Sequence, residues 1–192
     1  NIKNQLKAIV TAGPTKEHID PVRYITNKSS GKQGFEIAKA LMKKGISTTL
    51  ISGPTNLNSP KNIKVIRVET ADEMLNETKK NLPSDIVVCA AAVSDFKILD
   101  YNKNKIKKSE KVNLKLNRNI DILSYLSTHN LLRPKLVIGF AAETENIIKN
   151  AEEKILKKHC DWIIANDVSK KDIGFDSDFN EVSIIYKDKS KK

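Results

Sequence analysis

A chain of 192 residues with 39% hydrophobic and 30% charged side chains is the size of one ordinary α/β domain and can bury a core without disulfides or metal ions. It has no run of about 18 apolar residues, which excludes a membrane-spanning helix, and no apolar segment behind a basic amino end, which excludes a visible secretory signal. The formal net charge of +11 fits nucleic acid, a small polyanionic substrate or a lysine-rich background. None of the ten aromatic residues falls in a basic stripe spaced for base stacking, which counts against RNA.

The first half of the chain alternates apolar runs with amphipathic segments. The first apolar run ends at Gly13-Pro14 and the second at Gly53-Pro54, which are turn dipeptides. Strands are predicted at Lys7–Ala12, Ser47–Ser52 and Lys64–Val68, and helices at Gly31–Lys44 and Ala71–Asn81.

The second half begins with Asp85–Val93, which is nearly all apolar and predicts a central strand covered on both faces. Lys97–Leu116 breaks the pattern, because it is dense in lysine and its alternation at Val112–Leu116 suits a half-exposed hairpin arm. The remaining predicted elements are a helix at Asn119–Leu126, a strand at Leu136–Phe140, a helix at Thr144–His159, strands at Asp161–Ala165 and Val182–Tyr186, and a polar tail at Lys187–Lys192.

Strands that alternate with helices predict an α/β fold, a mostly parallel twisted sheet with helices on both faces, in the Rossmann-like manner. We expect one domain over residues 1–192, with a flap arm at about 97–118 and a tail at 187–192. Ligands of such sheets bind beyond the carboxyl ends of the strands, so the polar residues that follow strands are the candidates for a site. These are Gly13-Pro14-Thr15, Ser52-Gly53, Ser94-Asp95, Glu143-Thr144 and Asn166-Asp167.

Two stretches near the amino end are suited to binding an anion through backbone N–H groups. They are Gly13-Pro14-Thr15 and Ser29-Ser30-Gly31-Lys32, and the second opens a helix whose dipole adds positive potential. Two such pockets predict one substrate with several phosphates or two phosphorylated substrates side by side. The second stretch is not a Walker loop, because Thr26 and Gln33 stand where that loop requires glycine and a hydroxyl. A plain helix cap would also explain the two serines.

Other charged residues are placed to hold a nucleotide. Asp95 follows the alanine-rich strand end and is suited to a divalent ion or a ribose hydroxyl. Lys105-Ile106-Lys107-Lys108 is either a solvated charge run or a flap over a polyphosphate, and Lys154 with Lys158, four residues apart, would form a second clamp.

Several weaker motifs have simpler explanations. Gly31-x-x-Gly34 matches a KH loop but does not join two helices, and Tyr101-x-x-x-Lys105 matches a reductase pair but lacks an apolar helix face. Asp176-x-Asp178-x-Asn180 resembles a calcium loop, yet Glu181 takes the place of its glycine.

Cys89 and Cys160 lack a paired spacing, so we expect no disulfide, a buried Cys89 and a reducing, cytoplasmic compartment.

Seven stretches together resemble the phosphopantothenoylcysteine synthetase family, in family order and over nearly the whole chain. They are Thr11–Thr15, Ile19–Ile25, Asn27–Phe35, Ala90–Phe96, Lys105–Lys108, Gly139–Thr144 and Ala165–Val168. The resemblance implies a ribokinase-like, Rossmann-type sheet, a homodimer and a ligase of coenzyme A biosynthesis. In the bacterial branch, CTP with Mg²⁺ converts 4'-phosphopantothenate to an acyl-cytidylate and pyrophosphate, and the amine of L-cysteine then displaces CMP.

The resemblance also assigns roles to residues of this chain. Asn27 would hold the acyl carbonyl oxygen, and Lys105 would close over the activated carboxylate. The substrate-binding residues would be Ser29, Ser30, Gly31, Ala91, Ala92 and Arg23, the last reaching across the dimer. The nucleotide-binding residues would be Gly13, Pro14, Thr15, Asp95, Ile120, Asp121, Ile122, Leu123, Phe140, Lys154 and Lys158, with Asp95 as a candidate ligand for Mg²⁺.

One departure concerns base recognition, because Ile120 replaces the proline of the usual Asn-Pro-Asp-Ile stretch and leaves that loop less rigid. In many bacteria the family's ligase is fused behind a flavin-dependent phosphopantothenoylcysteine decarboxylase, so such a partner is implied, in the same chain or as a separate protein. The alternatives to a ligase are a nicotinamide-dependent reductase and a basic RNA-binding module. The ligase hypothesis expects neither a nucleic-acid nor a membrane partner.

Overall fold

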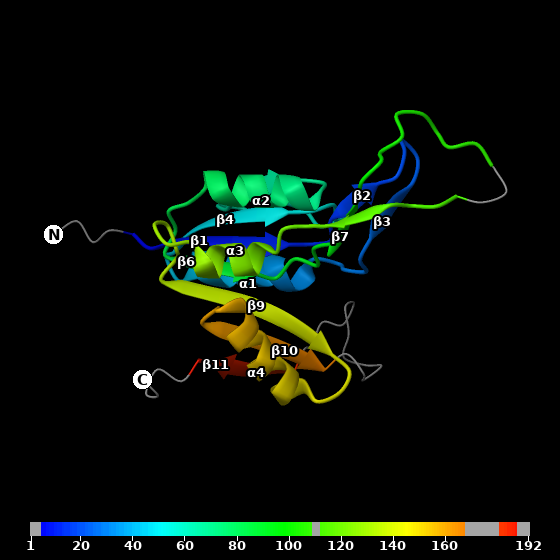
Figure 1. Cartoon of the computed structure of the whole chain (residues 1–192). Coiled ribbons are helices and arrows are strands. Elements are labelled where there is room, and N and C mark those ends of the chain that lie inside the picture. The colour runs from blue at the N-terminus through cyan, green and yellow to red at the C-terminus, as the bar shows by residue number, and fades with distance from the viewer. Residues whose placement is uncertain (1–4, 109–111, 168–180, 188–192) are drawn as a thin grey trace.

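The computed structural model describes residues 5–108, 112–167 and 181–187 and is built around one seven-stranded sheet (Figure 1). Its strands are β1 (Lys7–Ala12), β4 (Ser47–Ser52), β5 (Lys64–Arg67), β6 (Ile86–Cys89), β9 (Leu136–Glu143), β10 (Trp162–Asp167) and β11 (Val182–Tyr186). Their order is β11-β10-β9-β6-β1-β4-β5, and every pairing is parallel except that of β10 with β11. The mostly parallel sheet predicted from the sequence is confirmed.

In the described residues four helices cover this sheet, and they are divided unequally between its two faces. They are α1 (Lys32–Lys43), α2 (Ala71–Lys80), α3 (Ile122–Thr128) and α4 (Ile147–Lys158). Phe35 and Ala38 of α1 pack with Val10 of β1 on one face, whereas Met74 of α2 and Leu126 of α3 pack with Ile9 on the other. Because successive strand residues point to opposite faces, the neighbours Ile9 and Val10 serve two separate cores.

Several element boundaries differ from the sequence prediction. The strand predicted at Asp85–Val93 covers only Ile86–Cys89, although the Ala90 and Ala92 N–H groups still donate to the Thr11 and Gly13 carbonyls beyond it. Helix α3 begins at Ile122 rather than Asn119, because the Asp121 carboxylate accepts a hydrogen bond from the Ser124 N–H and caps the helix. Helix α1 begins after Gly31, whose φ of 78° is outside the helical range.

Two small antiparallel ribbons stand at the carboxyl end of the parallel strands (Figure 1). One pairs β2 (Lys16–His18) with β3 (Tyr24–Thr26), which the sequence did not predict. The other pairs β7 (Phe96–Ile98) with β8 (Leu116–Arg118) and forms the base of the predicted arm. Between these strands the arm extends beside β2 and β3, with Val112 and Leu114 exposed.

None of the helices in the described ranges is long and apolar enough to cross a membrane. Both cysteine thiols are free. Cys160 is buried, whereas the prediction of a buried Cys89 was wrong, because Cys89 is the last residue of β6 and is only partly buried. The Asp176–Asn180 stretch and the tail after Lys187 lie outside the described residues.

Candidate active site

The strand order reverses between β1 and β6. From β1 the chain continues to β4 and β5 on one side, and it later returns to add β6, β9 and β10 on the other. In doubly wound sheets such a switch point opens a crevice at the carboxyl ends of the strands. Here the two loops that flank it are joined, because the Ala92 N–H donates to the Gly13 carbonyl at 2.9 Å and Pro14 pairs with Ala92.

The two predicted anion-binding turns lie in contact at this crevice. A Cβ atom added to Gly31 would lie 3.3 Å from Gly13 Cα and 2.7 Å from the Thr55 methyl group. A Cβ atom added to Gly13 would lie 2.8 Å from the same methyl group. Both glycines also have positive φ angles, 74° and 78°, which L side chains rarely adopt. Glycine at both positions therefore lets the β1 turn and the start of α1 approach each other closely.

The first turn of α1 carries the positive end of the helix dipole into the crevice. The Ser29 hydroxyl accepts from the Gly31 N–H at 3.3 Å, and the Ser30 hydroxyl accepts from the Lys32 N–H at 3.4 Å. Both distances exceed the usual range for such bonds, so an anion would compete well for these N–H groups. The first turn contains no acidic residue, which keeps its potential positive.

Asn27 lies at the same crevice, opposite the loop that follows β6. Its side-chain amide donates to the Val93 carbonyl at 3.1 Å and, more weakly, to the Ala92 carbonyl at 3.4 Å. Asn27 is nevertheless exposed, so its amide is open to a ligand. The structure thus places Asn27 beside Ala92 and Val93, both only partly buried.

A second group of predicted residues gathers beside β9. The Lys158 ammonium pairs with the Asp121 carboxylate, and the Lys154 ammonium donates to the Phe140 carbonyl at 2.6 Å. Burial and the nearby Lys158 charge lower the pKa of Lys154. Burial by itself raises the pKa of Asp121, but the hydrogen bonds from Lys158 and Ser124 outweigh it and bring the pKa below its ordinary value. The half-buried Phe140 lies next to this pair of lysines, and their binding of a polyanion stays a prediction.

Asn119 connects these two groups and was not among the predicted site residues. Its side-chain amide donates to the Ser94 carbonyl at 2.9 Å, and its main-chain N–H donates to the Asp95 carbonyl at 2.9 Å. The Ser94 N–H in turn donates to the buried Thr15 hydroxyl at 3.0 Å. The loop of Asp95 is therefore tied to both the β1 turn and the stretch before α3. The Asp95 side chain stays exposed.

The residues of the Ile120–Leu123 stretch have different environments. Ile120 is 56% exposed, whereas the Ile122 and Leu123 side chains belong to the core. Because these two side chains are buried, only the main-chain groups of Ile122 and Leu123 are available to recognise a base. That is the mode of binding that the resemblance implies for this stretch.

Arg23 and Lys105 lie at the arm. The Arg23 guanidinium binds the Asp20 carboxylate and also donates to the Ile106 carbonyl at 2.8 Å. Lys105 is exposed next to that contact. Arg23 is thus engaged with the arm, while Ser29 and Ser30 are engaged with the first turn of α1.

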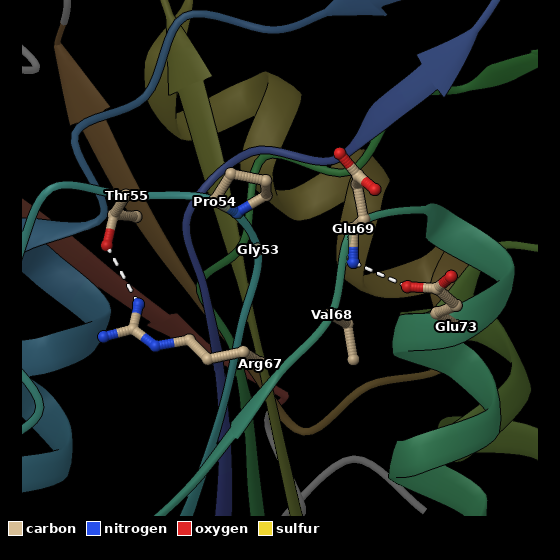
Figure 2. A pocket seen from close by; sticks show the side chains of 7 residues that line it. All are labelled: Gly53, Pro54, Thr55, Arg67, Val68, Glu69 and Glu73. Atoms are coloured by element: carbon tan, nitrogen blue, oxygen red, sulfur yellow. Dashed lines mark hydrogen bonds between the residues drawn. The ribbon is translucent and has the colours of Figure 1, made fainter. Parts of the chain in front are cut away.

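A cavity of about 400 Å³ lies beyond Thr55, at the ends of β4 and β5 (Figure 2). The Arg67 guanidinium donates to the hydroxyls of Thr55 and Ser59 and to the Leu57 carbonyl, which fixes the loop behind the two glycine turns. Across the cavity, the Glu73 carboxylate accepts from the Glu69 N–H at 2.7 Å and caps α2. The side chains of this cavity thus support the loop that presses Thr55 against Gly13 and Gly31. Gly53 was among the candidates that follow a predicted strand, whereas Thr55, Arg67 and Glu73 were not predicted.

The family model of the DNA/pantothenate metabolism flavoprotein C-terminal domain matches residues 3–192. The bifunctional coenzyme A biosynthesis protein CoaBC of Haemophilus influenzae is 44% identical over 192 residues, and that of Escherichia coli K12 is 40% identical over 196. These alignments cover 97% and 100% of this chain but 47% and 48% of the relatives, so the chain spans about half their length. A crystal structure of the C-terminal domain of a CoaBC protein superposes with a TM-score of 0.76 at 36% identity, covering 95% of this chain and 82% of that one.

Proposed function

The chain belongs to the family of the DNA/pantothenate metabolism flavoprotein C-terminal domain, and from this membership we propose that it is the ligase that joins 4'-phosphopantothenate to L-cysteine in coenzyme A biosynthesis. The curated relatives are bifunctional, and the crystal structure that it resembles is of their C-terminal domain. We propose CTP as the second substrate, an acyl-cytidylate as the intermediate and a homodimer as the active form. A flavin-dependent decarboxylase is the proposed partner activity, and the cytoplasm is the proposed compartment.

The observation that carries this proposal is the contact between Gly13 and Gly31, with Asn27 beside it. The start of α1 and the lysines Lys154 and Lys158 of α4, two helices that pack on opposite faces of the sheet, would supply two places for anions. A ligase that activates a carboxylate with a nucleotide must hold two polyanions in one cleft. It needs no nucleophilic side chain, because orientation and charge stabilisation supply the rate.

In the first step the phosphopantothenate carboxylate attacks the α-phosphorus of CTP, and the bond to pyrophosphate breaks. Lys154 and Lys158 would bind the triphosphate and stabilise the charge on the departing pyrophosphate. Ser29, Ser30 and Gly31 would hold the phosphate of phosphopantothenate at the α1 dipole, and Arg23 would add a further cation by reaching across the proposed homodimer. Lys105 would close over the reacting carboxylate.

In the second step the cysteine amine attacks the acyl carbon, and CMP leaves as the amide forms. Negative charge develops on the acyl oxygen in this step, and the Asn27 amide would donate a hydrogen bond to it. A donor that is already oriented by the Ala92 and Val93 carbonyls needs little reorganisation. That preorganisation is why an exposed asparagine suits the role.

Mg²⁺ fits this site as an ion carried by the nucleotide. In the described ranges no three His, Cys, Asp or Glu side chains converge on one point, so a cage of protein ligands is not formed there. Mg²⁺ usually binds through one or two carboxylates together with substrate phosphates, and the exposed Asp95 carboxylate supplies such a ligand. When bound, the ion would neutralise phosphate charge.

The strand order also suits a nicotinamide-dependent reductase, which remains the second candidate. The Tyr101 and Lys105 pair that would serve a reductase, however, lies in the non-helical arm, and both residues are exposed. Product analysis separates the two. With all three substrates and Mg²⁺, mass spectrometry should detect 4'-phosphopantothenoyl-L-cysteine and CMP, and omission of any substrate should abolish both. Formation of neither product, together with a change in NADPH fluorescence on binding, would favour the reductase.

A further inference from the structure

The arm that carries Lys105 is fastened to the turn between β2 and β3 by one buried carboxylate. The Asp20 side chain is 0% exposed, although it lies in a surface turn. Its Oδ1 atom accepts from the N–H groups of Val22 and Arg23 at 2.9 and 2.8 Å, which is the ordinary function of an aspartate in a turn.

The other oxygen of Asp20 reaches beyond the turn. Oδ2 accepts from Arg23 Nε at 3.0 Å and from Arg23 Nη2 at 2.5 Å, and it also accepts from the Ile106 N–H at 3.1 Å, 86 residues away. Arg23 Nη2 completes the arrangement by donating to the Ile106 carbonyl. Both main-chain polar groups of Ile106 are thus bound by the Asp20–Arg23 pair.

This contact has a direct consequence for the neighbouring residue. Ile106 is half-buried while Lys105, Lys107 and Lys108 on either side are exposed, so the contact fixes the chain and leaves the lysines free to face a ligand. The hydrogen bonds from Arg23 hold the pKa of the Asp20 carboxyl far below its ordinary value, so the carboxylate stays ionised throughout the working pH range. A second bond, from the Asn102 N–H to the Ile19 carbonyl, ties the same part of the arm to the same turn.

We propose that Asp20 is a positioning residue for the reaction, which holds the arm at Ile106 and so sets the position of the neighbouring Lys105. The inference rests on the proposed ligase function of Lys105. It goes beyond that function by assigning a role to a residue that does not touch the substrates. Loss of the Asp20 carboxylate would remove the hydrogen bonds from Arg23 and from the Ile106 N–H together. Lys105 would then be displaced from the position in which it acts.

The test is an Asp20→Asn variant, compared with Asp85→Asn as a matched control. Asp85 likewise accepts from a main-chain N–H, that of Lys7 at 2.9 Å, and from a cation, Lys135 at 2.8 Å, but it lies at the opposite end of β1. Asp20→Asn should lower kcat for amide formation by roughly 10- to 100-fold, the order of loss that misplacement of a catalytic group by about 1 Å produces. KM for CTP should change little, and Asp85→Asn should keep the wild-type kcat.

A double variant separates positioning from a general structural defect. If Asp20 acts through Lys105, then Asp20→Asn combined with Lys105→Gln should be about as slow as Lys105→Gln alone. If the wild-type enzyme is active and the fold-losses of the two single variants multiply in the double variant, the inference is overturned and the proposed function is not. A wild-type protein that releases no pyrophosphate with any nucleotide would instead overturn the proposed function, and the role of Asp20 with it.

Trypsin digestion tests the contact without any activity. Cleavage after Lys105, Lys107 or Lys108 should be several-fold faster in Asp20→Asn than in wild type and unchanged in Asp85→Asn. Equal cleavage rates would contradict the contact. If Asp20→Asn does not fold, Ile106→Pro removes the same donor from the arm while leaving Asp20 and Arg23 intact, and it should show the same loss of kcat. A normal kcat in that variant would overturn the inference.

Discussion

Gly13 and Gly31 lie so close that a Cβ atom at position 31 would come within 3.3 Å of Gly13 Cα. This contact joins the turn after β1 to the start of α1, and it makes one site of two loops that are separate in the sequence. Any side chain at either position would push the loops apart and would also meet the Thr55 methyl group.

Gly31→Ala should therefore weaken both the fold and the site. Holding alanine in the left-handed region should lower the free energy of unfolding by about 1–3 kcal/mol. The displaced α1 turn should also raise KM for phosphopantothenate. Gly45→Ala is the control, because Gly45 has a φ of 80° but nothing within 4 Å of its Cβ position. Thermal unfolding should show a lower free energy of unfolding for both variants. Kinetic measurements should show a higher KM for phosphopantothenate for Gly31→Ala alone. An equal KM in the two variants would show that the close approach is not needed.

Asn27→Asp should separate the two steps of the reaction. Aspartate cannot donate to the acyl oxygen, and its charge would oppose the charge that develops there. Loss of one such donor typically costs about 10²–10³ in kcat, so amide formation should slow by that order, while pyrophosphate release should slow far less. Rapid-quench measurement of both products checks this. Equal slowing of both steps, or none, would remove Asn27 from the proposed role.

Lys154→Met should weaken nucleotide binding. A hydrogen bond to a charged group contributes about 1.5–3 kcal/mol, so KM for CTP should rise roughly 10- to 100-fold. Lys157→Met is the control, because Lys157 is exposed on the same helix. If Lys154→Met and Lys157→Met have the same KM for CTP, Lys154 does not bind the nucleotide.

The same lysine predicts a pH dependence. Lysine is charged below its pKa and neutral above it, and burial lowers the pKa of Lys154 below the ordinary lysine value. Affinity for CTP should therefore fall as the pH rises through that lowered pKa. This fall should occur at a lower pH than the one that deprotonation of an exposed lysine would cause. Binding measured across the alkaline range should show this fall in wild type and not in Lys154→Met. An identical pH profile in both would contradict the assignment.

Neither thiol should take part in the chemistry. Burial raises the pKa of Cys89 to about 12 and that of Cys160 to about 11. Because the thiolate is the reactive form, iodoacetamide at pH 8 should label both slowly in the native protein and rapidly in urea, without loss of native activity. Fast native labelling that abolishes activity would show a reactive cysteine.

The sequence predicted the central sheet well, because its strands are apolar runs, two of which end in turn dipeptides. Lys7–Ala12, Ser47–Ser52 and Val182–Tyr186 have the predicted bounds. The strands β2 and β3 were missed, because three residues of mixed polarity carry no periodic signal.

The candidate site was predicted in part for the same reason. Glycines, serines and lysines next to strand ends are visible in a sequence, and the structure gathers Asn27, Gly31 and Ala92 at one crevice. Contacts between distant residues are not visible in this way. The Oδ2 atom of Asp20 reaches Ile106, and the side chain of Asn119 binds the Ser94 carbonyl. Neither contact follows from local spacing.

The central claim is that one crevice holds a nucleotide and an organic acid together and joins them before cysteine enters. Pyrophosphate release in the absence of cysteine tests it most directly, with Mg²⁺ present and with CTP or ATP as the nucleotide. We predict release with CTP only when phosphopantothenate is present, and far slower release with ATP. Release that is independent of phosphopantothenate, or no release with CTP, would contradict the account.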